Sequence, residues 1–315
     1  MGSVPGPARA AAASSKVSIA ELSAWPELKA DVTALHRAAM LERNGAGFDY
    51  PGLPDVAATV DLRQVAFDHL LVLQRTVFSG DTWFVRARFG GDARFERAVF
   101  SGAAMFNFAT FSGDAWFDAA VFSGAAVLIS AMFSRAAGFG SARFSGDTLF
   151  GVAKFSGFAY FPKAEFGAVG RDHVAIFTGC QFEKPTSLYD AIFHSRYPDF
   201  TGAMLHDQTT FSAEDQYWPK GGQVDPKQAK ASCAAIRHSM GRQRLPEAEH
   251  FFFRREMGFA TQIGGCWARL PYQAFEVFSG FGHSLMIPFG WLGLFWGLGA
   301  ACYWHYLATQ TGQAL

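Results

Sequence analysis

The sequence predicts an all-β solenoid that is closed by helices and followed by one membrane-spanning helix. From Phe78 onward, large apolar residues recur at steps that alternate between six and five residues. A small residue, most often alanine, stands two positions before almost every one of them. Near the C-terminus, the twenty residues from Leu285 to Trp304 carry no formal charge, and this is the length that a helix needs to cross a bilayer.

The periodic residues define an eleven-residue unit that reads AxFSGxAxFxx. On an α-helix, steps of five and six rotate side chains by about 140° and 240°, so they would scatter around the axis. On a flat strand, a five-residue step places the next side chain on the opposite face. A solenoid that turns a corner every five or six residues directs one large and one small side chain inward on each face. The predicted structural core ladder consists of Phe78, Phe84, Phe89, Phe95, Phe100, Phe106, Phe111, Phe117, Phe122, Leu128, Phe133, Phe139, Phe144, Phe150, Phe155, Phe161 and Phe166.

Glycine marks the predicted corners of the solenoid. It follows the inward phenylalanine by two positions, and glycine adopts positive φ without steric cost. We therefore expect positive φ at these glycines, with Asp or Ala in the extra position of the six-residue face. The glycines are Gly80, Gly91, Gly102, Gly113, Gly124, Gly146 and Gly157. Cys180 falls on a small inward position, where it replaces alanine.

From about Leu62 to Phe211 the chain resembles the pentapeptide-repeat family, whose motif is a tandem A-x-F/L-x-x. The resemblance implies a right-handed, quadrilateral β-helix over residues 61–213. Because a sixth residue is regularly inserted, each coil takes two eleven-residue units, or about 22 residues. Stacked at the spacing of ~4.8 Å between strands, about seven coils form a rod of roughly 30 Å.

The repeat is interrupted twice. The inward position expected after Phe166 is Asp172, and burying a lone carboxylate is costly, so we expect a loop over residues 167–173. The step from Phe193 to Phe200 is seven residues long and includes Pro198. Breaks in a regular rod are where individual binding features arise. The candidate partner-binding residues are Arg171, Asp172, His173, Arg196 and Tyr197.

Charge argues against nucleic acid as a partner. The chain of 315 residues has 27 basic and 27 acidic residues, and residues 61–213 have 13 and 14, respectively. A DNA-binding surface needs a basic face, and a mimic of DNA needs an acidic one. The sequence leaves open whether six outward arginines align as a basic patch near one end of the rod. They are Arg86, Arg88, Arg94, Arg97, Arg135 and Arg143.

The N-terminal region and the cysteines indicate an intracellular protein. Residues 1–16 are rich in Ala, Gly, Ser and Pro and lack the apolar run of a signal peptide, so we expect a disordered tail. Residues 17–60 are predicted to form a helical cap, over 17–43, and a connector. The four cysteines lie far apart without a CxxC motif, which favours a reducing compartment.

Residues 214–281 are expected to form a helical C-terminal cap and a juxtamembrane segment. Asp225-Pro226 provides an N-cap and a proline at N1, and Gly241 is predicted to end this helix. A second helix begins at Pro246. No second histidine stands at ligand spacing in this region, so we expect no metal site. We interpret four polar residues as helix-dipole and solvent-facing residues: Glu247, Glu249, His250 and Glu256.

Residues 282–308 are predicted to form the transmembrane helix, with lipid contact through 285–307 and a short tail at 309–315. Arg254, Arg255 and Arg269 precede it and no Lys or Arg follows, so the positive-inside rule places the solenoid in the cytoplasm. Residues 271–288 resemble the juxtamembrane stretch of membrane-attached bacterial pentapeptide-repeat proteins, which implies a single-pass protein of the bacterial inner membrane. The predicted packing face for a homo-oligomer consists of Gly293, Gly297 and Ala301.

The sequence shows no HExxH, no nucleophile elbow and no phosphate-binding loop, so we expect no catalytic residue and no cofactor. The favoured function is a membrane-tethered scaffold that presents a rigid rod to an unidentified cytoplasmic protein. One alternative follows from the resemblance, because some pentapeptide-repeat proteins bind DNA gyrase as acidic mimics of DNA. The other alternative is a subunit of an oligomeric, channel-like membrane protein.

Overall fold

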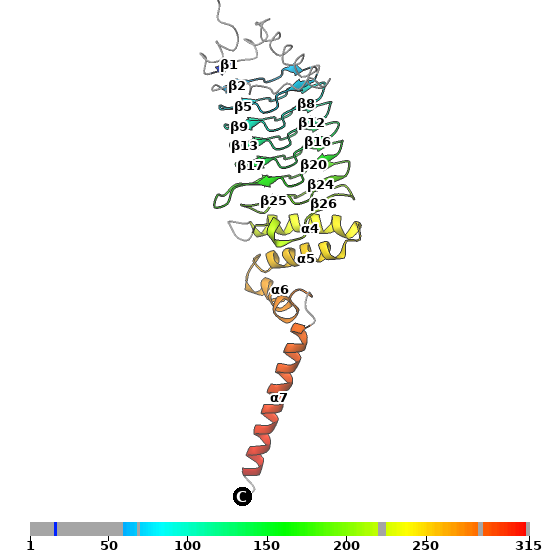
Figure 1. Cartoon of the computed structure of the whole chain (residues 1–315). Helices are drawn as coiled ribbons and strands as arrows, with labels where there is room; N and C mark the ends of the chain where they lie inside the picture. The colour runs from blue at the N-terminus through cyan, green and yellow to red at the C-terminus, as the bar shows by residue number, and fades with distance from the viewer. Residues whose placement is uncertain (1–15, 18–58, 68–69, 220–224, 283–285, 313–315) are drawn as a thin grey trace, which may run out of the picture.

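The structure is a computed structural model that describes residues 16–17, 59–67, 70–219, 225–282 and 286–312. Figure 1 shows a rod of stacked coils, with helices across its lower end and further helices that extend away from it. The predicted tail and most of the cap and connector at 17–60 lie outside the described residues. Lys16–Val17, at the border of these two segments, forms strand β1, which pairs with β2.

The rod is a parallel β-solenoid of about seven turns with four sheets. The first sheet contains β1 (Lys16–Val17), β2 (Thr59–Asp61), β6 (Thr82–Trp83), β10 (Ala104–Met105), β14 (Ala126–Val127), β18 (Thr148–Leu149) and β22 (Ala175–Ile176). The second contains β3 (Ala66–Phe67), β7 (Arg88–Phe89), β11 (Thr110–Phe111), β15 (Met132–Phe133), β19 (Lys154–Phe155) and β23 (Gln181–Phe182). The third contains β4 (Leu71–Val72), β8 (Ala93–Arg94), β12 (Ala115–Trp116), β16 (Ala137–Gly138), β20 (Ala159–Tyr160), β24 (Thr186–Leu188) and β26 (Thr210–Phe211). The fourth contains β5 (Val77–Phe78), β9 (Val99–Phe100), β13 (Val121–Phe122), β17 (Arg143–Phe144), β21 (Glu165–Phe166) and β25 (Ile192–Phe193).

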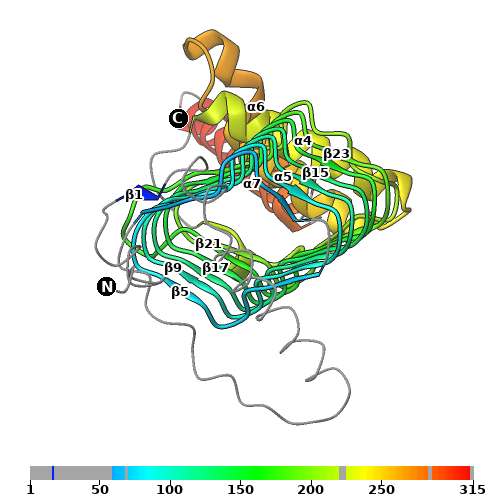
Figure 2. The same cartoon turned by 90° about the horizontal axis from the view of Figure 1, so that it is seen from above.

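The predicted coil length is confirmed by the strand pairing. Thr82 pairs with Ala104, and Phe89 pairs with Phe111, so equivalent residues of successive coils are 22 positions apart. Seen from above, the coils superpose in a four-sided outline (Figure 2). The regularly inserted sixth residue therefore lengthens two of the four faces and does not disturb the stacking.

The predicted phenylalanine ladder fills the interior of the rod. Each of its members is at most 3% exposed, and Leu128 is 1% exposed. Rings stack along the rod, as in the pair Phe89 and Phe111, whose centroids are 4.5 Å apart with an interplanar angle of 1°. Rings of neighbouring faces meet edge-on, as Phe95 meets Phe106 at 82°. Burial contributes about 1.5–3 kcal/mol per ring, and aromatic pairing adds about 0.5–1.5 kcal/mol.

The prediction of positive φ at the corner glycines is wrong. Instead, positive φ falls on residues of many types, which recur every eleven positions. They are Gln64, Arg75, Arg86, Arg97, Phe108, Ala119, Ser130, Ser141, Val152 and Lys163. Hydrogen bonds between coils hold these corners, since Phe108 N donates to Ile129 O at 2.9 Å and Val152 N donates to Thr178 O at 2.8 Å. Stacking thus imposes a left-handed conformation that the side chains alone disfavour.

The repeated glycines serve a close approach between coils. A Cβ added at Gly113 would lie 2.4 Å from the backbone carbon of Gly91, and one added at Gly157 would lie 2.1 Å from Arg135 O. Both distances are far below van der Waals contact. The aspartates of the six-residue faces reinforce the same stacking, because Asp81 Oδ1 accepts a hydrogen bond from Ala103 N at 2.8 Å in the next coil.

Two helices close the C-terminal end of the rod as predicted. After the 3₁₀ turn η1 (Asp215–Tyr217) come α4 (Pro226–Arg242) and α5 (Pro246–Ala260). Asp225 caps α4, since its Oδ1 accepts from Lys227 N at 2.9 Å. Gly241 does not end α4 but lies inside its last turn, where a Cβ would approach the Glu249 carboxyl at 3.2 Å. Ser232 Oγ of α4 accepts from Phe200 N of the last coil at 2.9 Å, so cap and rod share one core.

The chain ends in helices that pack little against the rest. The described residues after the cap form α6 (Cys266–Ser279), which has no buried residue, and the long helix α7 (Met286–Gly312). Figure 1 shows α6 between the cap and α7, with α7 pointing away from the solenoid.

Candidate functional site

An irregular corner lies near the C-terminal end of the solenoid, where the chain departs from the 22-residue coil. Thr148 pairs with Ala175, and Phe166 pairs with Phe193, each 27 positions apart. The extra residues form a loop at 167–174, and Asp172 is exposed on it, as predicted. The coil after the loop stays in the ladder, because Phe200 stacks on Phe177 with ring centroids 4.8 Å apart.

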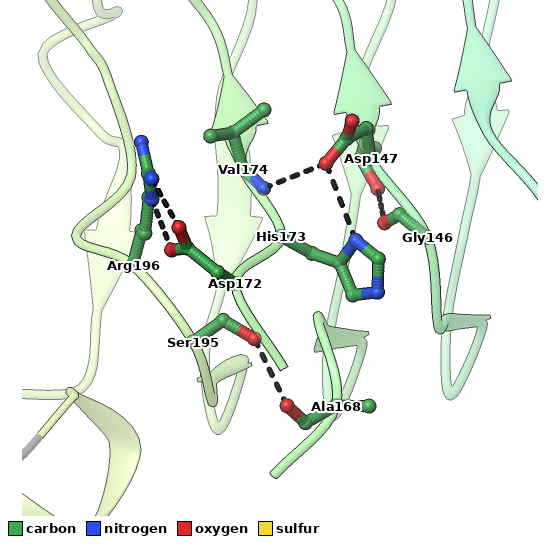
Figure 3. Close-up of polar contacts among 9 residues, drawn as sticks. Gly146, Asp147, Ala168, Asp172, His173, Val174, Ser195 and Arg196 are labelled. Atoms are coloured by element: carbon green, nitrogen blue, oxygen red, sulfur yellow. Dashed lines mark hydrogen bonds and ion pairs between the residues drawn. The ribbon is translucent and has the colours of Figure 1, made fainter. Parts of the chain in front are cut away.

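An ion pair joins the loop to the following coil. Asp172 accepts from both Nε and Nη2 of Arg196, so the pair is bidentate (Figure 3). The hydrogen bonds from Arg196 lower the pKa of the Asp172 carboxyl, and the same contact raises the pKa of the guanidinium. Ser195 Oγ donates to Ala168 O at 3.0 Å at the base of the loop. The loop is therefore fixed on the rod at two points.

A second set of polar contacts fixes the end of the loop. His173 Nδ1 lies 3.3 Å from Asp147 Oδ1, and the same oxygen accepts from Val174 N at 3.1 Å (Figure 3). On the neighbouring fourth sheet, Glu165 lies between two basic side chains: Arg143 at 3.3 Å and His194 at 3.4 Å. The corner thus presents carboxylates, histidines and arginines in alternation.

The structure brings together four of the five predicted partner-binding residues. Arg171, Asp172 and His173 lie on the loop, and Arg196 lies beside it. Tyr197 does not belong to this surface, since it is only 3% exposed. Its ring stacks on Trp218 at 5.2 Å and meets Phe259 of α5 at 5.1 Å. The prediction for Tyr197 is wrong because the cap covers it, and burial raises the pKa of its phenol.

The interpretation of Glu256 as solvent-facing is also wrong. Its residue is 7% exposed, and its Oε2 accepts from Arg237 Nε at 2.8 Å, which joins α5 to α4. The two buried cysteines belong to the core: burial raises the pKa of Cys180 and of Cys233 to about 12. Within the described parts of the chain, no group of three or more His, Cys, Asp or Glu side chains is arranged to hold a metal ion.

The six outward arginines do not form one patch. Arg88 lies on the second sheet, Arg94 on the third and Arg143 on the fourth, so they face different sides of the rod. Three of the six are paired with carboxylates, as Arg135 is with Asp114 at 3.5 Å. The solenoid surface is therefore mixed in charge on every side where these arginines lie.

Two outward columns escaped the sequence analysis. The first sheet carries an apolar column of half-buried and buried side chains in pairing register: Trp83, Met105, Val127, Leu149 and Ile176. Beside the third sheet, Glu96 and Asp118 take equivalent places in successive coils. Burial raises the pKa of both carboxyls, and the charge of Asp118 adds to the rise at Glu96. Both columns become visible in the sequence when residues are compared at a spacing of 22. A spacing of eleven combines residues from two different faces of the rod.

The comparison with known families agrees with this geometry. The family model for pentapeptide repeats, which holds nine copies of the repeat, matches residues 62–110 and residues 73–121. Residues 62–121 of the solenoid therefore carry the repeats of the pentapeptide-repeat family. Pentapeptide-repeat solenoids are generally non-enzymatic. The matched residues are the first coils of the rod, and the same pairing register continues to Phe166. No curated protein and no solved structure matches this pentapeptide-repeat chain significantly.

The pentapeptide-repeat rod is joined to one helix segment, Met286–Leu307 of α7, that is long and apolar enough to cross a membrane. No part of this segment is buried. The predicted packing face is open: a Cβ at Gly293 or Gly297 would meet nothing within 4 Å, and Ala301 is exposed. The length and the composition of this segment are those of a membrane span.

Proposed function

We propose that this pentapeptide-repeat protein is a non-catalytic scaffold, tethered to a membrane by α7, whose solenoid presents a binding surface for another protein. The observation that carries the proposal is that one part of the chain buries its apolar residues and another part leaves them exposed. The solenoid and its cap bury their aromatic residues in one core. The apolar segment of α7 is entirely unburied. Such a helix is stable where lipid replaces water around it.

The irregular corner is our proposed partner-binding surface. Its loop is fixed by the Asp172–Arg196 pair and by the Ser195–Ala168 hydrogen bond, so little conformational entropy is lost on binding. Arg171 is exposed at the tip, and arginine is enriched at protein interfaces. A partner with acidic and hydrogen-bonding groups would complement this corner.

The orientation is part of the proposal. Arg254 and Arg269 lie on the solenoid side of α7, and residues 308–315 on its other side contain no Lys or Arg. The positive-inside rule then favours a solenoid that lies in the cytoplasm and is anchored by α7 in the bacterial inner membrane. The partner would be a cytoplasmic protein.

Site-specific photo-crosslinking tests the binding surface. A photoreactive residue at Arg171 should give a discrete adduct in native membranes. A photoreactive residue at Val152, which is 60% exposed at another corner of the rod, is the matched control and should give none. Equal yields at both positions, or no adduct at either, would contradict a protein-binding role for the irregular corner.

A second function is favoured by the open face of Gly293 and Gly297, which would let two or more copies of α7 pack closely. In that case the protein is a subunit of an oligomeric channel-like assembly. Conductance across reconstituted bilayers distinguishes this function, since a scaffold gives none. The gyrase-inhibitor alternative has no support in the mixed charge of the rod, and a supercoiling assay would detect it.

A further inference from the structure

Helix α6 presents two different faces. One face packs against the cap: the Lys230 Nζ of α4 lies 5.6 Å from the ring centroid of Tyr272, and Phe275 meets Phe253 of α5 at 6.5 Å. These contacts connect α6 to the closed end of the solenoid.

The other face of α6 is apolar and exposed. Trp267 is 83% exposed, Leu270 48%, Val277 52% and Phe278 45%. With Ala274 between them, these positions follow the spacing of three and four residues that forms one stripe on a helix. At 100° per residue, Arg269 and Glu276 lie away from this stripe, and Gln273 lies at its edge. Trp267, Leu270, Ala274, Val277 and Phe278 are called the α6 stripe below.

The α6 stripe is continuous with the start of α7. A turn with positive φ at Gly280, Phe281 and Gly282 separates the two helices. Across this turn, Trp291 Nε1 donates to Val277 O at 2.9 Å, and its ring lies 4.9 Å from Phe278. The stripe therefore lies beside the first turns of α7, at the level where a span would enter the bilayer.

Exposed apolar surface of this kind is unfavourable in water. An amphipathic helix with Trp, Phe and Leu on one face is suited to the boundary between headgroups and acyl chains. Tryptophan favours that boundary because its ring is apolar and its N–H can reach polar groups. The 14 residues of α6 span about 21 Å along the helix axis, enough for an extended contact with lipid.

We propose that α6 is an interfacial helix that lies along the membrane surface with its stripe among the lipid headgroups and upper acyl chains. The inference rests on the proposed function, because α7 must span the bilayer to bring α6 to its surface. It adds a second membrane contact outside the span. Figure 2 shows α6 to one side of the coils, so this contact lies off the axis of the rod.

This second contact would fix the orientation of the solenoid relative to the membrane. A single span alone leaves a tethered domain free to rotate and tilt. Because α6 contacts lipid on one face and the cap on the other, through Tyr272 and Phe275, it holds the solenoid at a defined angle to the membrane. The irregular corner would then be presented in a constant direction.

Fluorescent labels in the full-length protein test this inference. The exposed thiols are removed by Cys266→Ser and Cys302→Ser, and burial raises the pKa of Cys180 and Cys233 to about 12, so these react little near neutral pH. A polarity-sensitive label is then placed by Leu270→Cys on the stripe or by Glu276→Cys, an exposed position on the same helix that lies away from the stripe. A third chain carries the label at Leu298→Cys in α7. All three are reconstituted in vesicles of phosphatidylcholine and phosphatidylglycerol.

Spin-labelled lipids near the headgroup should quench the label at 270 several-fold more than the label at 276, which a water-soluble quencher should reach. Deep spin-labelled lipids should quench the label at 298. Equal access of the aqueous quencher to 270 and 276, with 298 still quenched from the membrane, would overturn the α6 inference and leave the tether intact. A label at 270 that neither quencher reaches would indicate a protein contact, which also overturns it. Failure of deep lipids to quench 298 would contradict the tether itself.

Discussion

The solenoid and the C-terminal helices contain the same kinds of apolar residue, but the solenoid buries them and the helices expose them. Phe117 in the rod is 0% exposed, whereas Phe289 in α7 is 66% exposed and Trp296 is 76% exposed. The rod buries its own apolar surface by stacking aromatic rings from coil to coil. Among the described residues, α6 has no buried residue, and the apolar segment of α7 is unburied. The difference shows that the rod covers its apolar residues within its own fold, whereas α6 and α7 leave theirs exposed.

The largest effect should come from removing one ring of the ladder. Phe117→Ala leaves a cavity among rings that stack above and below it, at 4.9 and 5.0 Å, so unfolding should cost about 3–5 kcal/mol less. The same substitution at Phe289 should leave solenoid stability unchanged, because that ring contacts no core. Thermal and denaturant unfolding of the full chain in detergent compares the two. Equal destabilisation would show that α7 packs on the folded rod.

A smaller effect should follow from filling the space between coils. Gly113→Ala places a methyl group 2.4 Å from the backbone of Gly91, so the coils must separate locally, at a cost of about 1–3 kcal/mol. Gly297→Ala meets nothing within 4 Å and is the control in the other region. If Gly113→Ala were neutral in the same unfolding assay, close coil stacking would not explain the repeated glycines.

Self-association should depend on one face of α7. Gly293→Leu with Gly297→Leu blocks the close approach of two helices, and we expect dimer affinity in detergent to fall about tenfold, or roughly 1.4 kcal/mol. Gly299→Leu, which lies on another side of the helix, should leave affinity unchanged. Analytical ultracentrifugation measures both. A dimer that survives the double substitution would remove the predicted packing face.

The smallest effect should be a pH dependence within the rod. Burial raises the pKa of Glu96 and Asp118 above their ordinary values of 4.5 and 3.8, so the folded state holds their protons to higher pH than the unfolded state. Their contribution to stability is present below those ordinary values and is lost as pH rises through the raised ones. Glu96→Gln with Asp118→Asn should therefore gain up to about 1 kcal/mol relative to the parent at neutral pH, and less in acid, after allowing for solvent screening.

Unfolding at acid and neutral pH checks this expectation. Asp118 Oδ1 accepts a hydrogen bond from Gly140 N of the next coil at 2.9 Å. Asp92→Asn is the control, since Asp92 Oδ1 accepts the equivalent hydrogen bond from Asp114 N at 3.0 Å. A double variant that tracks the parent at both pH values would show that the two carboxyls are solvated like surface groups.

The core of the rod was predictable because a single period fixes which side chain is inside. The burial of each ladder phenylalanine from Phe78 to Phe166 followed from its position in the eleven-residue unit. The residues with positive φ at the corners were not predictable. Val152 adopts positive φ because its N–H donates to the next coil, and not because valine prefers this conformation. The corner hydrogen bonds between coils join residues that are 21 or more positions apart, so they leave no local signal in the sequence.

The candidate site was predictable only in part for a similar reason. The break in the period located the loop that carries Asp172, but its pairing with Arg196 depends on how the longer coil folds back on the next. Tyr197 stands next to Arg196 in sequence, yet α5 covers it from more than fifty residues away, where Phe259 meets its ring. Burial by a distant element is invisible to periodicity.

The central claim is that α7 holds the folded solenoid at a membrane, and membrane fractionation of the full chain tests it most directly. Leu294→Lys with Leu298→Lys places two charges on side chains that are 51% and 54% exposed, so folding is unaffected while each charge costs insertion about 2.5–3.5 kcal/mol. We predict that the parent protein stays with the membrane after alkaline carbonate extraction, and that the double variant is soluble with an unchanged solenoid melting temperature. A parent protein found in the soluble fraction would contradict the account.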